Sequence, residues 1–243
     1  MTSNPMTQGE IYRQNVCDGE PMTAVGAVNK TIILLAVTAV TAIYTWMEVF
    51  AGHLDKAQIL MWIGIIAGVI LAFVMRAKPQ NAKILSIAYA VCEGMAIGGI
   101  SAVYESQFHG IVANAALGTF TTLFVMLFLY KAGVIKATDT FRRVITTATF
   151  SIMIFYLVSI VISFFNPNFV AAWHNGMLGI GISVAICAVA ALNFILDFNF
   201  IERGQNEMAP KYFEWYGAFA LLVTIIWLYL EILRLLAMLN RNK

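Results

Sequence analysis

Charged residues are scarce in this sequence. Only 12% of its 243 residues are Asp, Glu, Lys or Arg, whereas a soluble domain carries about 25%. Apolar residues make up 60% of the chain, so many of them must face lipid rather than a protein core. The net charge of +2 is too small to indicate nucleic-acid binding. The composition therefore predicts an all-α membrane protein that lies in a lipid bilayer and binds no nucleic acid.

Several chemical motifs are also missing. The three cysteines, Cys17, Cys92 and Cys187, form no CxxC pair, which argues against a disulfide framework or a zinc ribbon. No HExxH helix, no GxSx motif with an intramembrane His, and no Lys within 215–239 for a retinal Schiff base are found. We therefore expect neither an enzyme nor a cofactor. The first 30 residues lack the apolar core of a signal peptide, so we expect the spans themselves to direct insertion.

Long apolar stretches are abundant. A membrane span needs about 20 mostly apolar residues, and the sequence predicts seven, at 32–50, 57–75, 84–104, 111–130, 144–165, 177–198 and 216–239. We expect a mobile polar tail over 1–30, followed by one seven-helix domain over 31–243. Glycines four residues apart, at Gly64 and Gly68 and at Gly94 and Gly98, suit close helix packing, although glycine is also simply common in membrane helices.

Loop charges indicate an orientation. One side of the membrane would hold the tail and the loops 76–83, 131–143 and 199–215. These segments carry eleven of the fifteen cationic residues, namely Arg13, Lys30, Arg76, Lys78, Lys83, Lys131, Lys136, Arg142, Arg143, Arg203 and Lys211. The opposite loops carry only Lys56. The positive-inside rule therefore places the amino terminus in the cytoplasm. The last segment would then export a basic end against that rule, so it either spans fully or is re-entrant.

Apart from Glu48, which lies at the outer end of the first predicted span, three acidic residues fall within predicted spans: Glu93 in the third, Asp197 at the end of the sixth and Glu231 in the seventh. A carboxylate at mid-bilayer depth costs about 2.5 kcal/mol or more, so such residues usually have a partner or a function. Structural roles remain open for each. Glu231 can pair with Arg234, three residues later on the same helix face, Asp197 can be an interfacial helix end, and Glu93 can bond a backbone carbonyl.

A shared site for Asp197 and Glu231 is the sharper hypothesis. Two carboxyl groups in contact would hold a single proton over a wide pH range, and that shared proton would tie two helices together. Gain or loss of the proton would free the helices, which describes a pH-sensitive latch. When ionised, the pair would offer the hard oxygen ligands that calcium prefers. Arg234 would compete for Glu231, and Glu93 is a candidate pore-lining acid.

These segments carry a family resemblance. LDFNFIERG and WLYLEILRLL resemble the transmembrane Bax-inhibitor-motif family, in which span six ends in an Asp-x-x-x-Ile pattern, matched by Asp197 and Ile201. The last helix of that family carries Leu-Tyr-Leu-Asp, matched by Leu228 to Glu231 with Glu in place of Asp. NPNF and APKYFEWYGAF resemble a bacterial subgroup. The connection between the last two spans is expected to be longer than usual, with Glu202, Glu207, Lys211 and Glu214 in it.

The resemblance implies six helices around a central carboxyl-terminal one, and a calcium leak gated by the two acids in a bacterial inner membrane. It also leaves a different class open, an interaction protein that modulates a membrane protease or another quality-control complex. A proton-coupled transporter is a third possibility, because the same acids can relay protons.

Overall fold

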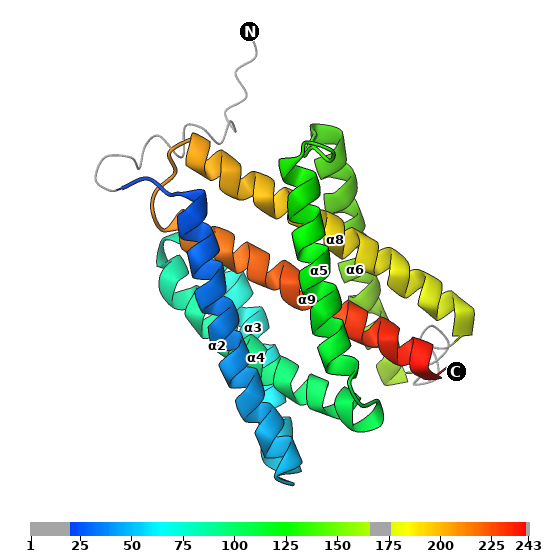
Figure 1. Ribbon diagram of the computed structural model, residues 1–243. Helices are drawn as coiled ribbons and strands as arrows, with labels where there is room; N and C mark the ends of the chain where they lie inside the picture. The colour runs from blue at the N-terminus through cyan, green and yellow to red at the C-terminus, as the bar shows by residue number, and fades with distance from the viewer. Residues whose placement is uncertain (1–19, 166–175, 242–243) are drawn as a thin grey trace. The chain divides into compact units, whose positions relative to one another are not determined.

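The structure is a computed structural model, and it describes residues 20–165 and 176–241. Within these ranges, seven long helices are present (Figure 1). They are α2 Ala24–Phe50, α3 Leu54–Ala77, α4 Ala82–Gln107, α5 Ile111–Lys131, α6 Asp139–Phe165, α8 Gly176–Asn206 and α9 Phe213–Arg241, with a short 3₁₀ turn, η2 Pro79–Asn81, before α4. Each long helix is long and apolar enough to cross a membrane. The prediction of an all-α protein with seven candidate spans is confirmed.

The helices extend beyond the predicted spans. Helix α2 begins at Ala24 rather than near residue 32, because the Thr23 side chain caps it by accepting the Gly26 N–H at 3.0 Å. Helix α8 continues to Asn206, so Glu202 is helical and the connection to α9 is short, over 207–212. The prediction of a longer than usual connection, with Glu202 and Glu214 in it, was therefore wrong. Hydropathy detects only the apolar part of a helix, and polar end residues that remain helical escape it.

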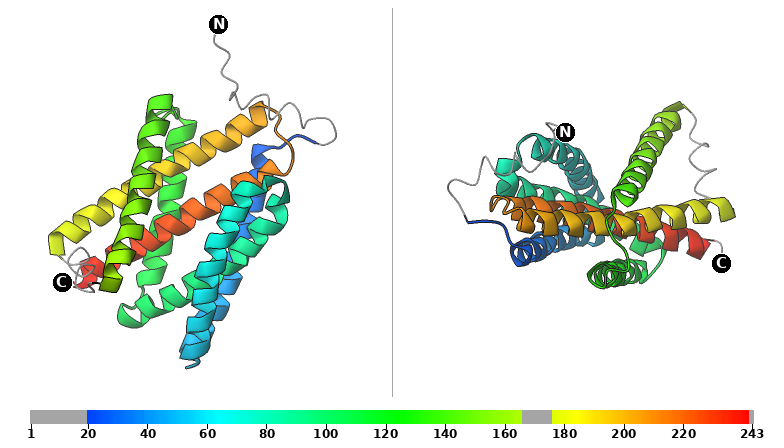
Figure 2. Two further views of the ribbon diagram at one scale, coloured as in Figure 1. Left: turned by 180° about the vertical axis from the view of Figure 1, so that it is seen from behind. Right: turned by 90° about the horizontal axis from the view of Figure 1, so that it is seen from above.

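The helices group into two compact units, and helices α4, α8 and α9 contribute to both. Unit 1 contains the chain up to Ala102 together with Asn199–Leu222. In unit 1, α2 and α3 run side by side (Figures 1 and 2). Two glycines of α4 lie close to these helices. A Cβ at Gly98 would lie 2.9 Å from Ala42 Cα of α2, and a Cβ at Gly99 would lie 3.2 Å from Met61 Cβ of α3.

Unit 2 contains Val103–Phe198 and Val223–Lys243. Helix α5 approaches α9 at Gly118, where an added Cβ would lie 3.5 Å from an Ile232 methyl. Glu105 closes the turn before α5 by accepting the N–H groups of Gly110 and Val112 at 2.6 and 3.1 Å. These carboxylate contacts satisfy donors that a helix start otherwise leaves unpaired.

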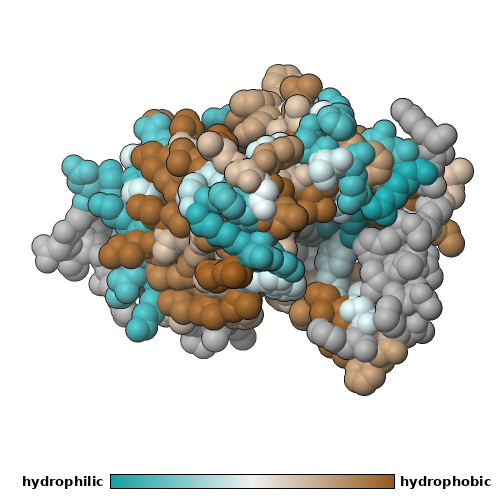
Figure 3. Space-filling view, turned by 90° about the horizontal axis from the view of Figure 1, so that it is seen from below, coloured by the Kyte–Doolittle hydropathy of each residue, from teal (hydrophilic) through white to brown (hydrophobic). Residues whose placement is uncertain are grey.

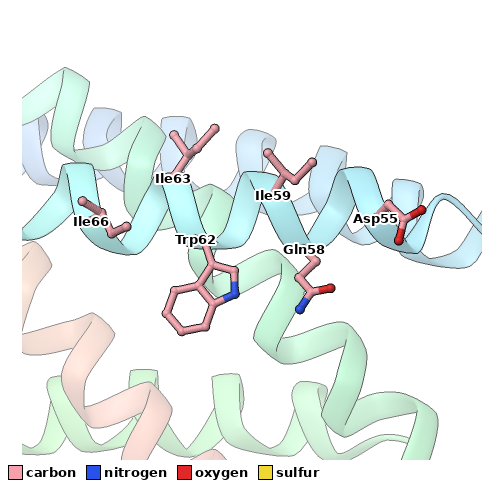
Figure 4. A pocket seen from close by; sticks show the side chains of 6 residues that line it. All are labelled: Asp55, Gln58, Ile59, Trp62, Ile63 and Ile66. Carbon is pink, nitrogen blue, oxygen red and sulfur yellow. The ribbon is translucent and has the colours of Figure 1, made fainter. Parts of the chain in front are cut away.

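Exposed apolar side chains are spread along the helices. They include Val40, Ile66, Phe73, Phe128 and Ile160, each more than half exposed. Brown hydrophobic residues cover broad areas of the face in Figure 3. On α3, a hollow is lined by Asp55, Gln58, Ile59, Trp62, Ile63 and Ile66, and Figure 4 shows Gln58 and Trp62 extending from one side of the helix. Apolar surface of this extent suits a lipid environment, so the chain is an integral membrane protein.

Helices α4 and α9 are the most enclosed. In each of these two helices, 50% of the residues in the most apolar stretch are buried, compared with 6–33% in the other five spans of the described chain. The enclosure of α9 is what a central carboxyl-terminal helix requires. The arrangement of six helices around it stays a prediction.

Candidate functional site

Helices α8 and α9 run antiparallel in unit 2 and meet at Asp197. The Thr224 hydroxyl of α9 donates a hydrogen bond of 2.6 Å to Asp197 Oδ2 of α8. A second contact joins the same helices, since Arg234 Nη2 of α9 lies 3.5 Å from Ser183 Oγ of α8. On the same helix, the rings of Phe194 and Phe198 stack with their centroids 6.0 Å apart. Asp197 itself is half-buried, and the Thr224 hydroxyl is the described hydrogen-bond partner of its carboxyl group.

Glu231 lies further along α9 and is only 5% exposed. The Tyr156 hydroxyl of α6 donates to Glu231 Oε1 at 2.5 Å. Arg234, on the same face of α9, places Nη2 2.8 Å from Glu231 Oε2. The carboxylate therefore has both a hydroxyl donor from another helix and a counter-charge from its own.

Arg234 connects three helices. Its Nη1 donates to the Tyr156 hydroxyl at 2.6 Å, and its guanidinium carbon lies 5.4 Å from the centroid of the Tyr156 ring. The ion pair with Glu231 lacks hydrogen-bond geometry at Oε2, and Arg234 Nε has no hydrogen-bond partner among the described residues. Helices α6, α8 and α9 thus share one polar network, and two of its buried atoms are not satisfied.

The structure gives the two predicted latch residues different partners. Among the described residues, no hydrogen bond joins Asp197 to Glu231. Thr224 is the α9 residue opposite Asp197, and Glu231 follows it by two helical turns, roughly 10 Å along the axis. The two acids therefore hold α9 at two successive levels in the described arrangement, the first against α8 and the second against α6.

Glu93 lies in unit 1, on α4. Its side chain bonds with Tyr89, one turn earlier on the same helix. A Cβ at Gly68 of α3 would lie 2.9 Å from Glu93 Oε1, so the carboxyl group faces the close approach of α3 and α4. No group of three or more His, Cys, Asp or Glu residues suited to a metal ion occurs in the described chain.

Sequence reasoning missed the hydroxyl and amide partners. Tyr156, Thr224 and Ser183 all bond to the acids or to Arg234. In the same unit, Asn193 of α8 donates to Thr149 Oγ1 of α6 at 2.9 Å. Polar side chains inside apolar helices commonly bond across helices, so their presence was a usable signal. Sequence alone offers no means of pairing these residues.

Sequence comparisons with known proteins indicate the family to which this chain belongs. An uncharacterized protein of Chlamydia muridarum is 29% identical over 138 residues, which cover 55% of this chain and 57% of that protein. The match thus spans little more than half the length of this relative. No solved structure matches the chain significantly. The sequence pattern of the family described as Bax inhibitor 1 like matches residues 3–241. With seven candidate spans and a match over nearly the whole sequence, the chain belongs to the Bax inhibitor 1-like family.

Proposed function

We propose that this protein is a pH-sensitive, calcium-permeable leak channel whose gate is formed by Asp197 and Glu231. The family includes pH-sensitive calcium leak channels, and its members are generally channels or modulators rather than enzymes. The observation that carries the proposal is the placement of two carboxyl groups on α8 and α9, each bonded to a hydroxyl of another span. Calcium prefers such oxygen ligands.

Protonation provides the gating chemistry. Neutral Glu231 would leave Arg234 without its counter-charge, and an unpaired buried cation is costly. The contact of α9 with α6 therefore depends on the charge of Glu231. At Asp197, proton uptake changes a carboxylate acceptor for Thr224 into a neutral acid. Both steps act on α9, so a change in pH alters the contacts that hold this helix.

The proposal departs in one respect from direct proton sharing. Each acid acts through its own hydroxyl partner, Thr224 or Tyr156, in the arrangement described above. Arg234 then serves as a fixed counter-charge for Glu231, and it also competes with Asp197 for contact with the Glu231 carboxylate. Glu93 remains the proposed pore-lining acid. The proposed setting is a bacterial inner membrane with a cytoplasmic amino terminus, and the Chlamydia relative favours a bacterial origin.

Calcium efflux from liposomes tests the channel. Purified protein should release trapped calcium at a rate that changes between about pH 5 and 8. Asp197→Asn and Glu231→Gln should each flatten the pH profile, because an amide cannot exchange the proton. Glu207→Gln, which alters an exposed acid in the α8–α9 connection, should leave the profile intact.

Three results would count against the proposal. Unchanged efflux and an unchanged pH profile in both site variants would remove the gate. Saturable counterflow of an organic substrate would instead indicate a proton-coupled transporter. A protein that releases no calcium but captures a membrane protease through its amino-terminal tail would fit the interaction role.

A further inference from the structure

A second buried carboxylate lies in unit 1, at a sequence position midway between the two acids of the gate. Glu214, in the first turn of α9, is fully buried. Its Oε1 accepts the Thr23 N–H at 2.9 Å and the Thr23 hydroxyl at 3.0 Å. Its Oε2 forms an ion pair with Lys30 of α2. The proposed gate uses none of these residues.

Neighbouring contacts attach the same short segment to the α8–α9 connection. The Met22 N–H donates to the Ala209 carbonyl at 2.8 Å, and the Ala24 N–H donates to Gln205 Oε1 at 2.6 Å. The Met22 side chain is 1% exposed and fills the space where Gly204 lacks a Cβ. We call this set of contacts the clasp; its residues are Met22, Thr23 and Lys30 on one side and Gln205, Ala209 and Glu214 on the other.

The charges around the clasp are nearly balanced. Lys30 lies over the Trp215 ring, 5.5 Å from its centroid. Lys211 Nζ lies 3.5 Å from Glu214 Oε1 and 3.2 Å from Glu20 Oε2. The hydrogen bond to Glu20, together with the charge of Glu214, raises the pKa of Lys211 above its usual value. Two cations therefore neutralise one buried carboxylate, and the outer one is shared with exposed Glu20.

We propose that the clasp is a conformational restraint on α9, and that opening it increases ion efflux. Helix α9 is continuous from Phe213 to Arg241 and carries both Glu214 and Glu231. A displacement of α9 as a whole would therefore act on the contacts of Glu214 as well as on those of Glu231. The inference rests on the proposed channel function, because efflux is one of its readouts.

Gly26 offers a way to open the clasp without removing a charge. A Cβ at Gly26 would overlap the Glu214 carboxylate, whereas one at Gly181 of α8 would meet nothing within 4 Å. Gly26→Ala should therefore displace Glu214, and Gly181→Ala is the matched control. Glu214→Gln, which removes the charge that Lys30 neutralises, is an independent second variant.

The first readout is the state of the clasp itself. In full-length protein whose three native cysteines are replaced by alanine, Met22→Cys introduces a buried thiol for maleimide labelling. Gly26→Ala and Glu214→Gln should each speed labelling by about tenfold, as expected when local opening becomes easier. Gly181→Ala should not. Labelling that stays slow in both variants would overturn the clasp.

The second readout is calcium efflux from liposomes containing the same proteins. Gly26→Ala and Glu214→Gln should raise efflux several-fold over the control. The opposite perturbation combines Met22→Cys with Gly204→Cys, since Met22 Cγ would lie 3.8 Å from a Cβ at position 204. Oxidation of this pair should lower efflux, and a reductant should restore it.

The two proposals fail in different ways. If efflux responds to Asp197→Asn but to neither the opened nor the cross-linked clasp, the channel stands and the restraint is wrong. If no variant releases calcium at any pH, the channel function fails, and the gating role of the clasp fails with it. The labelling rates still report on whether the contacts open.

Discussion

At the scale of single residues, the Glu231–Arg234 pair shows how a charge is tolerated inside an apolar helix. The carboxylate is almost fully buried, yet it has a guanidinium at 2.8 Å and a phenol at 2.5 Å. A buried ion pair often adds little net stability, whereas removal of one partner leaves an uncompensated charge. The network therefore positions α6 against α9 more than it strengthens the fold.

Tyr156→Phe tests this network. The substitution removes the hydroxyl that donates to Glu231 and accepts from Arg234. Leaving buried charged groups with one bond fewer should lower the free energy of unfolding by about 1–3 kcal/mol. The measurement is the thermal unfolding midpoint in detergent.

Tyr104→Phe is the matched control, because the Tyr104 hydroxyl has no hydrogen bond in the described part of the chain. It should leave the midpoint nearly unchanged. Equal midpoints for Tyr156→Phe and the control would mean that the phenol does not hold the network.

At the scale of helices, glycine spacing decides how closely α4 approaches its neighbours. Gly94 and Gly98 face α2, where added Cβ atoms would overlap Thr41 and Ala42. Gly64 of α3 faces α4 in the same way, with Cys92 and Ala96 opposite. Small residues at intervals of four allow backbones to pack closely in lipid, where dispersion contacts hold helices together.

Gly98→Ala should therefore destabilise unit 1. The new Cβ would meet backbone atoms of Ala42, which cannot rotate away as a side chain end can. Overpacking of this kind costs about 1–3 kcal/mol, and the unfolding midpoint should fall accordingly. Gly181→Ala, with open space at the new Cβ, should be neutral or slightly stabilising because alanine favours helix. A stable Gly98→Ala variant would show that α2 and α4 do not pack this closely.

At the scale of the whole molecule, seven candidate spans have a consequence for the chain ends. An odd number of crossings places the two termini on opposite sides of the membrane. The cationic loops predict a cytoplasmic amino terminus. The last helix, Phe213–Arg241, is long enough to cross completely.

Reporter fusions at the carboxyl terminus test this topology. Alkaline phosphatase fused there should be active, because it folds on the outer side, and green fluorescent protein should be dark. A fusion of the fluorescent protein at the amino terminus should be bright. Fluorescence at both termini would instead indicate that the last segment re-enters on the cytoplasmic side.

Much of the fold followed from composition and apolar run length. Seven spans were predicted near their observed places because a bilayer imposes length and hydropathy on every crossing helix. Helix ends were less predictable. The Thr23 cap of α2 and the polar last turns of α8 lie outside the apolar stretches that mark a span. The length of the α8–α9 connection was therefore overestimated from the sequence.

The residues of the candidate site also fall into two groups, those that could be identified from the sequence and those that could not. Asp197, Glu231 and Arg234 were identifiable from the sequence because each is costly in an apolar span. Their partners were not. Thr224 and Tyr156 look like ordinary members of their helices until α8 and α6 are placed beside α9. Glu214, expected in a connecting loop, is instead a buried residue of α9.

The sequence by itself thus determined that the chain lies in a membrane, how many helices can cross it and which charges need an explanation. Those conclusions depend on the transfer of each side chain between water and lipid, which is a property of single residues and short runs. Only the tertiary structure decided that Asp197 bonds to Thr224, that Glu231 bonds to Tyr156 and Arg234, and that Glu214 receives Thr23 and Lys30. Hydrogen bonds depend on distance and direction, and helix packing sets both.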